Sequence, residues 1–398
     1  MFKLLLVALI SLIVPFKFVY ADVLTSIKDS WDSAKNVLIE LSEEEEIKTD
    51  LPQERALAIW DDLKDNFEEI AELKLNKESA PNESFFGKTK RDYDEKIETI
   101  FQILSKITND PQIVKDRSSL EKLKLKIAKS KQKSSDLKTK ALLSTGKDKE
   151  KLIDKSNSHL SDIDEYQNSY NEVLSNVQRR LQSYNLPLDF DQVKVLLSRV
   201  DSDDIIGMTT SFSVIAELTK QFSEATLESG EDLQIAKNYY FMHVILLELQ
   251  MHIQANYIDK LENEYLVKLG NLKRENGTLI AETKSMVNSS EGSHKKVYEQ
   301  NLNSQQYTRK VLDLYDDILK IDLKKIKNGR NKVYDNFLIA LNTYETVNIS
   351  SDLAVLMEDN KNLFNEVMKL QTPEMITFEN LQMQDAFQAL TLQLSDNE

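Results

Sequence analysis

The chain has 398 residues, a formal net charge of −15, 29% charged residues, 8 Gly, 6 Pro and no Cys. The acidic balance argues against nonspecific nucleic-acid binding, and the lack of Cys excludes a disulfide scaffold and cysteine-ligated metal sites. Gly and Pro occur at roughly a third of their ordinary frequency. Because turns and strands use both residues, their scarcity predicts an all-α fold of few, long helices.

Residues 1–21 are typical of a secretory signal peptide. Lys3 precedes an apolar run over residues 4–16, and Ala21 offers a small residue for cleavage. The run is about 13 residues long, shorter than the ~20 that a membrane-spanning helix needs. We therefore expect an extracytoplasmic protein, periplasmic in the first place and secreted in the second. Because Lys17 lies between the apolar run and the cleavage site, a membrane anchor formed by an uncleaved leader is a third alternative.

Residues 22–186 are predicted to form an N-terminal region of acidic and basic helical hairpins. Apolar residues recur in steps of four and three over residues 27–41, which is the spacing of a seam between packed helices. A second amphipathic helix is predicted over residues 51–73, where Pro52 suits a first helical turn. A third is predicted over residues 93–107.

An antiparallel helical hairpin is predicted around a turn at Ser144, Thr145 and Gly146. Heptad spacing continues before the turn from Leu120 to Ala141, with serines that make a thin apolar seam. Residues 152–184 form the returning amphipathic helix. Arms of about 30–35 residues would reach ~45–55 Å.

Charge in this region is strongly segregated. Residues 40–72 hold 13 acids against 3 bases, whereas residues 115–151 hold 13 bases against 5 acids. One interpretation is that the two blocks neutralise each other in a folded-back hairpin or remain as solvated faces. The other is that the basic block 115–151 makes peripheral contact with an anionic membrane surface or surface polymer.

Residues 187–398 are predicted to form a more apolar bundle of long helices. The most hydrophobic helix covers residues 233–269, after which Gly270, Gly277 and Gly292 are expected to interrupt the chain. A long helix is predicted over residues 295–347, and the residues in heptad register at its end are Val333, Phe337, Ala340, Tyr344 and Val347.

Two apolar segments of this region leave alternatives open. The stretch 239–252 is apolar on nearly all faces, which fits the core of a bundle, a partner groove or membrane insertion. A last amphipathic helix, residues 372–394, is expected to fold back onto the bundle, with docking to another protein as the alternative.

The sequence predicts no catalytic, cofactor-binding or metal-binding residues and therefore a non-enzymatic protein. The chain lacks a Gly-x-Ser-x-Gly elbow and a phosphate-binding loop. No two of its four histidines, which are His159, His243, His252 and His294, have i, i+4 spacing.

Residues 201–204 (Asp, Ser, Asp, Asp) resemble the start of a calcium loop. Ile206 and Phe212 occupy the positions where such a loop needs Gly and a bidentate Glu. We therefore interpret residues 201–204 as an N-cap for a helix beginning near Ile205.

These observations predict a helical coiled-coil protein that acts as scaffold, tether or adaptor in an envelope assembly. Its helical seams would bind protein partners or a second copy of the chain. The alternative function is a secreted, membrane-active pore former, with residues 239–249 as the segment released onto a membrane.

Overall fold

The computed structural model describes residues 35, 51–84, 87–228, 233–346 and 381–395, which form helices and short connections without any strand. The predicted all-α class is confirmed for these residues. The predicted signal peptide, the seam over residues 27–41 apart from Lys35, and the start of the last helix at residues 372–373 lie outside them.

The described helices, in chain order, are α3 (Leu51–Ala58), α4 (Trp60–Ser79), α5 (Lys90–Ile107), α6 (Pro111–Leu142), α7 (Gly146–Ser183), α8 (Phe190–Leu196), α9 (Ser202–Glu228), α10 (Leu233–Lys260), the π-helix η1 (Leu261–Tyr265), α11 (Leu266–Ser289), α12 (Gly292–Thr346) and α14 (Leu381–Ser395).

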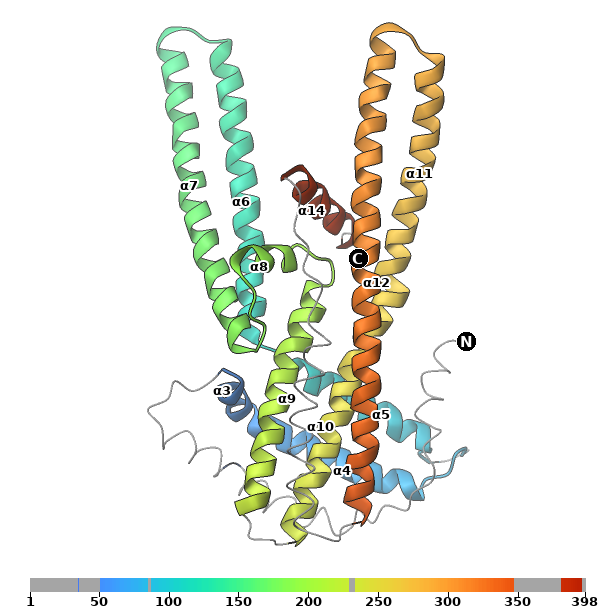
Figure 1. Cartoon of the computed structure of the whole chain (residues 1–398). Coiled ribbons are helices and arrows are strands. Elements are labelled where there is room, and N and C mark those ends of the chain that lie inside the picture. Colours follow the sequence, from blue (N-terminus) through green and yellow to red (C-terminus); the bar gives the residue numbers. More distant parts are fainter. Residues whose placement is uncertain (1–34, 36–50, 85–86, 229–232, 347–380, 396–398) are drawn as a thin grey trace.

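The molecule has a helical base from which two arms rise on the same side (Figure 1). One arm is the antiparallel pair α6 and α7, and the other is α11 with the first part of α12. The base contains α3, α4, α5, α9, α10 and the C-terminal part of α12. Helix α12 has 55 residues, which corresponds to about 80 Å. It is therefore long enough to belong to both an arm and the base.

The core of the base is rich in aromatic residues. The Trp60 and Phe222 rings lie 6.0 Å apart between centroids, and Phe222 stacks on Tyr239 at 5.8 Å. On the other side of α10, Phe241 contacts Tyr344 at 5.6 Å. The apolar stretch that begins at Tyr239 is buried against α9 and α12, which confirms its predicted place in the core. Within it, Glu248 forms an ion pair of 2.6 Å with Lys74 of α4.

The seam of the first arm is partly polar. The hydroxyl groups of Ser134 on α6 and Ser156 on α7 lie 2.8 Å apart and are buried, and Ser130 is buried in the same seam. These small side chains allow the two helices to approach each other closely, while the hydrogen bond satisfies both hydroxyls. The coiled-coil character predicted for this pair stays a prediction.

Two expectations about the helices were wrong. The helix predicted over residues 51–73 is interrupted at Ile59, because α3 packs on α9 whereas α4 packs on α5. Helix α11 runs through Gly270 and Gly277, and a break occurs only before Gly292, which has a φ of +62°. A single helical Gly costs about 1 kcal/mol, which packing of α11 along α12 can offset.

Among the described residues the two charged blocks do not pair with each other, and residues 40–50 of the acidic block lie outside the described part of the chain. The basic helix α6 pairs with α7, and the acidic helix α4 pairs with α5. The apolar seams decide these pairings, since burying a leucine stabilises far more than bringing solvated charges together. The basic block is therefore left as an exposed surface of the arm.

The chain bends between α7 and α8 at Asn185, whose φ of +59° is the left-handed conformation that Asn tolerates. The division into residues 22–186 and 187–398 at this point stays a prediction. One hydrophobic cluster contains residues from both ranges, because α3 and α5 pack against α9 and α10.

Candidate functional site: polar clusters at the roots of the two arms

The first arm begins at a strong helix cap. Asp110 precedes Pro111, and its Oδ1 accepts hydrogen bonds from the backbone N–H groups of Gln112 at 2.7 Å and Ile113 at 3.2 Å. Asp at the N-cap followed by Pro in the first turn is a favoured helix start, because the carboxylate satisfies free donors and Pro has none. The local sequence thus determines where α6 begins.

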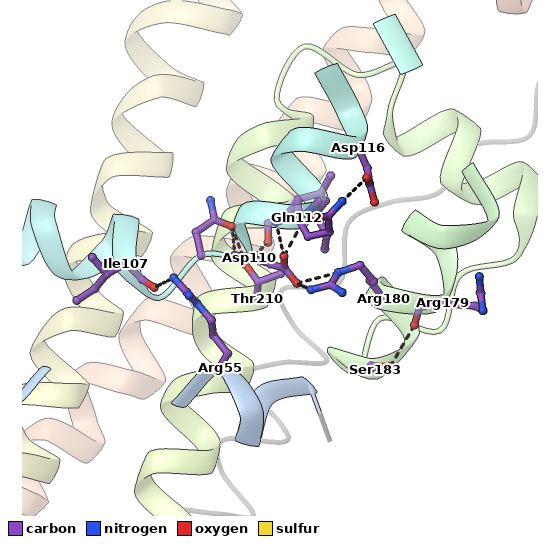
Figure 2. A network of polar contacts seen from close by, with 12 residues as sticks. Arg55, Ile107, Asp110, Gln112, Asp116, Arg179, Arg180, Ser183 and Thr210 are labelled. Atoms are coloured by element: carbon purple, nitrogen blue, oxygen red, sulfur yellow. Dashed lines mark hydrogen bonds and ion pairs between the residues drawn. The ribbon is translucent and has the colours of Figure 1, made fainter. Parts of the chain in front are cut away.

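The same carboxylate also holds the end of α7. Arg180 donates from Nη2 and Nε to Asp110 Oδ2, at 2.6 and 3.1 Å (Figure 2). The Asp110 side chain is only 1% exposed. Burial, together with the nearby Asp110 charge, raises the pKa of the Tyr184 hydroxyl well above its ordinary value. Asp110 therefore joins the two helices of the arm where they meet the base.

The connection between α5 and α6 is tied to the base by further bonds. Asn109 Oδ1 accepts from the Thr210 hydroxyl of α9 at 2.9 Å. The Arg55 guanidinium of α3 donates to the carbonyl of Ile107 (Figure 2). At this crossing α9 has Gly207, where a Cβ would come within 3.1 Å of the Asn109 side chain. The root of the first arm is thus fixed by side chains from α3, α7 and α9.

The second cluster is a buried group of charges around Arg199, which lies between α8 and α9. Arg199 donates from Nε and Nη2 to the two carboxylate oxygens of Asp201, at 2.9 and 2.7 Å. The same Nη2 lies 2.5 Å from Asp322 of α12. The hydroxyl of Tyr257 on α10 donates to Asp201 at 2.7 Å. All four residues are at most 3% exposed.

Electrostatics keep the two donor groups of this cluster protonated. Burial alone would lower the pKa of Arg199, but Asp201 and Asp322 more than compensate and hold the pKa above its ordinary value. Burial and the Asp201 charge raise the pKa of Tyr257. The guanidinium therefore stays charged and donates to both carboxylates, and the phenol stays protonated and donates to Asp201.

The predicted cap at residues 201–204 has a larger role than capping. Helix α9 begins at Ser202, and the carbonyl of Asp201 accepts from the N–H of Ile205, but the Asp201 carboxylate binds Arg199 and Tyr257. Periodicity could not reveal this, because Asp322 lies 123 residues away from Arg199. The sequence did contain one signal of the cluster. Arg199, a residue type that is rarely buried, lies two positions before Asp201 at the start of an apolar helix.

The next two acids of α9 connect the cluster to both arms. Asp203 forms an ion pair with Arg117 of α6. Asp204 accepts from Lys260 and from the Tyr265 hydroxyl, each at 2.7 Å. The start of α9 is thus bonded to the first arm on one side and to η1 on the other.

The π-helix η1 lies where α10 leaves the base and continues as α11 of the second arm (Figure 1). Single-turn π segments within α-helices are uncommon and often lie at functional sites. Here Tyr265 bonds to Asp204, and Glu262 of η1 lies 2.5 Å from Lys327 of α12. The transition from base to arm is therefore held on two sides.

Helix α14 folds back onto this junction, which confirms the expectation for its described residues. Phe387 stacks on Tyr315 of α12, with 4.1 Å between the ring centroids and nearly parallel planes. The Tyr315 hydroxyl accepts from the N–H of Val200 at 2.7 Å, and Thr391 donates to the carbonyl of Ser198 at 2.6 Å.

The histidines are dispersed through the structure. His159 lies 3.1 Å from Asp162 on α7, His252 lies 3.2 Å from Glu98 of α5, and His294 is exposed near the end of the second arm. His243 is buried in α10, and burial lowers its pKa to about 4. Among the described residues, no group of three or more His, Cys, Asp or Glu is placed to hold a metal ion.

The chemistry that this arrangement supports is anchoring. The side chains around Arg199 are inaccessible to solvent and are engaged with one another, so a substrate could reach none of them without disrupting the cluster.

None of the described helices has the length and apolarity that crossing a bilayer requires. Comparison with protein-family models, with curated proteins and with solved structures found no match for this chain.

Proposed function

We propose that the protein is a non-enzymatic helical scaffold, tether or adaptor in an extracytoplasmic, periplasmic envelope assembly. The observation that carries this proposal is the pair of long helical arms that rise from one base on the same side (Figure 1). Such a shape holds two contact surfaces at a set separation. Localisation outside the cytoplasm is supported by the leader-like residues 1–21.

The polar clusters at the arm roots support the same function. A scaffold must transmit position from one end to the other, which requires stiff connections between arms and base. Asp110 with Arg180 and the Arg199 cluster supply them, because buried, fully paired polar groups cannot be rearranged without exposing an unpaired charge.

The experiment that tests the proposal is photo-crosslinking in the cells that make the protein. A photoreactive phenylalanine analogue replaces Val297 near the end of the second arm or Leu143 at the end of the first. The matched control replaces Asp65, an exposed residue of α4 in the base. We expect discrete protein crosslinks from at least one arm position, in the extracytoplasmic fraction, and none from position 65.

Two outcomes would contradict the proposal. One is the absence of protein crosslinks from both arm positions in a correctly localised chain, together with unchanged envelope integrity after gene deletion. The other is dye release from vesicles by the purified protein, which would favour the pore-forming alternative. That function would require residues 239–249 to leave the core of the base, where their apolar side chains are buried.

A further inference from the structure

We infer that the free end of the α6/α7 arm docks on an anionic phospholipid surface, with Leu142 and Leu143 inserted between the lipids. This inference rests on the proposed adaptor function, of which it names one partner. It concerns only the first arm and is tested by a readout of its own.

The first observation is the exposure of two adjacent leucines at the free end of the α6/α7 arm. Leu142 ends α6 and is 81% exposed, and Leu143 in the following turn is 87% exposed. They are the most exposed large hydrophobic residues that the structure describes. The turn they occupy lies at the end of the arm away from the base (Figure 1). Side chains at such a position can enter a flat surface without any rearrangement of the fold.

The second observation is the charge around these leucines. Residues 126–155 contain ten exposed lysines and four acids, a net charge of +6 within a chain whose overall charge is −15. Lys138, Lys140 and Lys147 lie within about 6 Å of the turn along the helix axes, at 1.5 Å per residue. Their charges are therefore within one Debye length of any surface that the leucines touch, where attraction to anionic headgroups is strong.

The end of the second arm differs from that of the first in both its charge and the exposure of its apolar residues. Residues 276–305 at its end contain three lysines and three acids, so that this end carries no net charge. Its exposed apolar residues are less exposed, with Met286 at 44% and Val297 at 51%. Both arms point the same way, but only the first combines a basic surface with fully exposed apolar residues at its end.

The two exposed leucines favour a lipid surface over a soluble polyanion as the partner of this arm. A polyanion would need the lysines alone and would leave Leu142 and Leu143 in water. A bilayer interface accepts apolar side chains and binds the lysines at the same time. Since no described helix can cross a bilayer, the contact is peripheral.

The test is flotation of the full chain with phosphatidylcholine vesicles that contain phosphatidylglycerol, compared with vesicles of phosphatidylcholine alone. We expect binding only to the anionic vesicles, and release at high salt. Leu142→Ser/Leu143→Ser should lower the partition coefficient about tenfold or more, whereas the matched variant Met286→Ser/Val297→Ser should not change it. Reversal of Lys138, Lys140 and Lys147 to Glu should abolish binding, whereas reversal of Lys284, Lys295 and Lys296 should not.

A direct probe of insertion uses the absence of Cys from the chain. Leu143→Cys and Val297→Cys each give a single labelling site at an exposed position, so that folding is not at stake. An environment-sensitive dye at position 143 should shift to the blue with anionic vesicles, and the same dye at position 297 should not.

The inference is overturned if the double serine variant binds anionic vesicles as well as the unmodified chain does. It is also overturned if the lysine reversals lower binding to heparin and to vesicles equally while the dye at position 143 does not shift. Failure here would leave the adaptor function intact, because protein crosslinks from Val297 report on the second arm. Protein crosslinks absent from both Leu143 and Val297, with vesicle binding retained, would instead contradict the adaptor function.

Discussion

At the scale of single residues, the central feature is a group of charges that the fold has removed from water. Taking a guanidinium and two carboxylates out of water is costly, and this cost is offset only when each charge has good partners. Arg199, Asp201, Asp322 and Tyr257 satisfy this condition with contacts of 2.5–2.9 Å. Because they come from the α8–α9 connection, α10 and α12, the group is satisfied only when these three parts are assembled.

The first prediction concerns Arg199. Arg199→Met should lower the free energy of unfolding by about 3–5 kcal/mol, because it leaves two carboxylates buried without their cation. Urea unfolding followed by circular dichroism measures the change. Adding Asp201→Asn and Asp322→Asn should recover part of the loss, since the triple variant buries no charge. Arg91→Met, which removes an exposed i, i+4 ion pair with Glu95, should change stability by less than about 0.5 kcal/mol. Equal effects of Arg199→Met and Arg91→Met would contradict this account of the cluster.

The second prediction concerns pH and His243. Burial lowers its pKa in the folded protein to about 4, below the ordinary value of 6.5. The unfolded chain therefore binds the proton first, and the stability present above pH 6.5 is lost as the pH falls toward 4. Between pH 6.5 and 4, this contribution to the unfolding free energy changes by about 1.4 kcal/mol per pH unit.

His243→Met should remove this part of the pH dependence, so that its unfolding free energy falls less steeply between pH 6.5 and 4 than that of the unmodified protein. Urea titrations at several pH values measure the slopes. His294→Met, at an exposed position, should follow the unmodified protein. Parallel profiles for all three proteins would show that His243 is solvated or protonated in the folded state.

At the scale of elements, the two helices of the first arm begin in different ways. Asp110 caps α6 with its side chain, whereas Thr145 precedes α7 without any side-chain cap. The capped start lies in the base, where α6 must leave in a fixed direction. The uncapped start lies at the free end, where backbone N–H groups can bond to water. The two ends of one arm thus differ in how firmly they are held.

The third prediction compares these two starts. Asp110→Ala should destabilise the protein by about 2–3 kcal/mol, since it removes the cap and leaves the part-buried Arg180 without its carboxylate. Thr145→Ala should cost less than about 0.5 kcal/mol. Thermal or urea unfolding measures both, and amide exchange at residues 112–115 should rise only in Asp110→Ala. A cost for Thr145→Ala as large as that for Asp110→Ala would contradict the different roles of the two ends.

At the scale of the whole molecule, stability is concentrated in the base. The base buries Trp60, Phe212 and Phe222, whereas the outer part of the first arm buries Ser130, Ser134 and Ala141. Less apolar area is therefore removed from water per residue toward the free end. Local unfolding should therefore begin at the free ends of the arms and reach the base last.

The fourth prediction follows from this gradient. In native-state hydrogen exchange, amides at residues 130–160 should exchange at least tenfold faster than those of α10 in the base. Limited trypsin digestion should cut at the lysines of residues 138–151 before it cuts at Lys74 or Lys77 of α4. Uniform protection of arm and base, or earlier cleavage in α4, would show that the molecule unfolds as one cooperative unit.

The periodicity of the sequence predicted much of the architecture because a helix buries one face whatever its partner is. The heptad positions Val333, Phe337, Ala340 and Tyr344 are all buried, as their spacing predicted. The turn at Gly146, with a φ of +58°, follows from local chemistry in the same way, since Gly alone takes up this conformation without strain. The break at Ile59 and the continuity through Gly270 were missed because both depend on which neighbour each face meets.

By itself, the sequence determined the helical class, most of the helix positions and the buried faces, since these follow from interactions between residues close along the chain. Only the tertiary structure decided that α4 pairs with α5, that two arms rise from one base, and that Arg199 meets Asp322 across 123 residues. The physical reason is that apolar faces are interchangeable as partners when taken one at a time. The choice among them depends on the burial of all faces together and on the need to pair every buried charge.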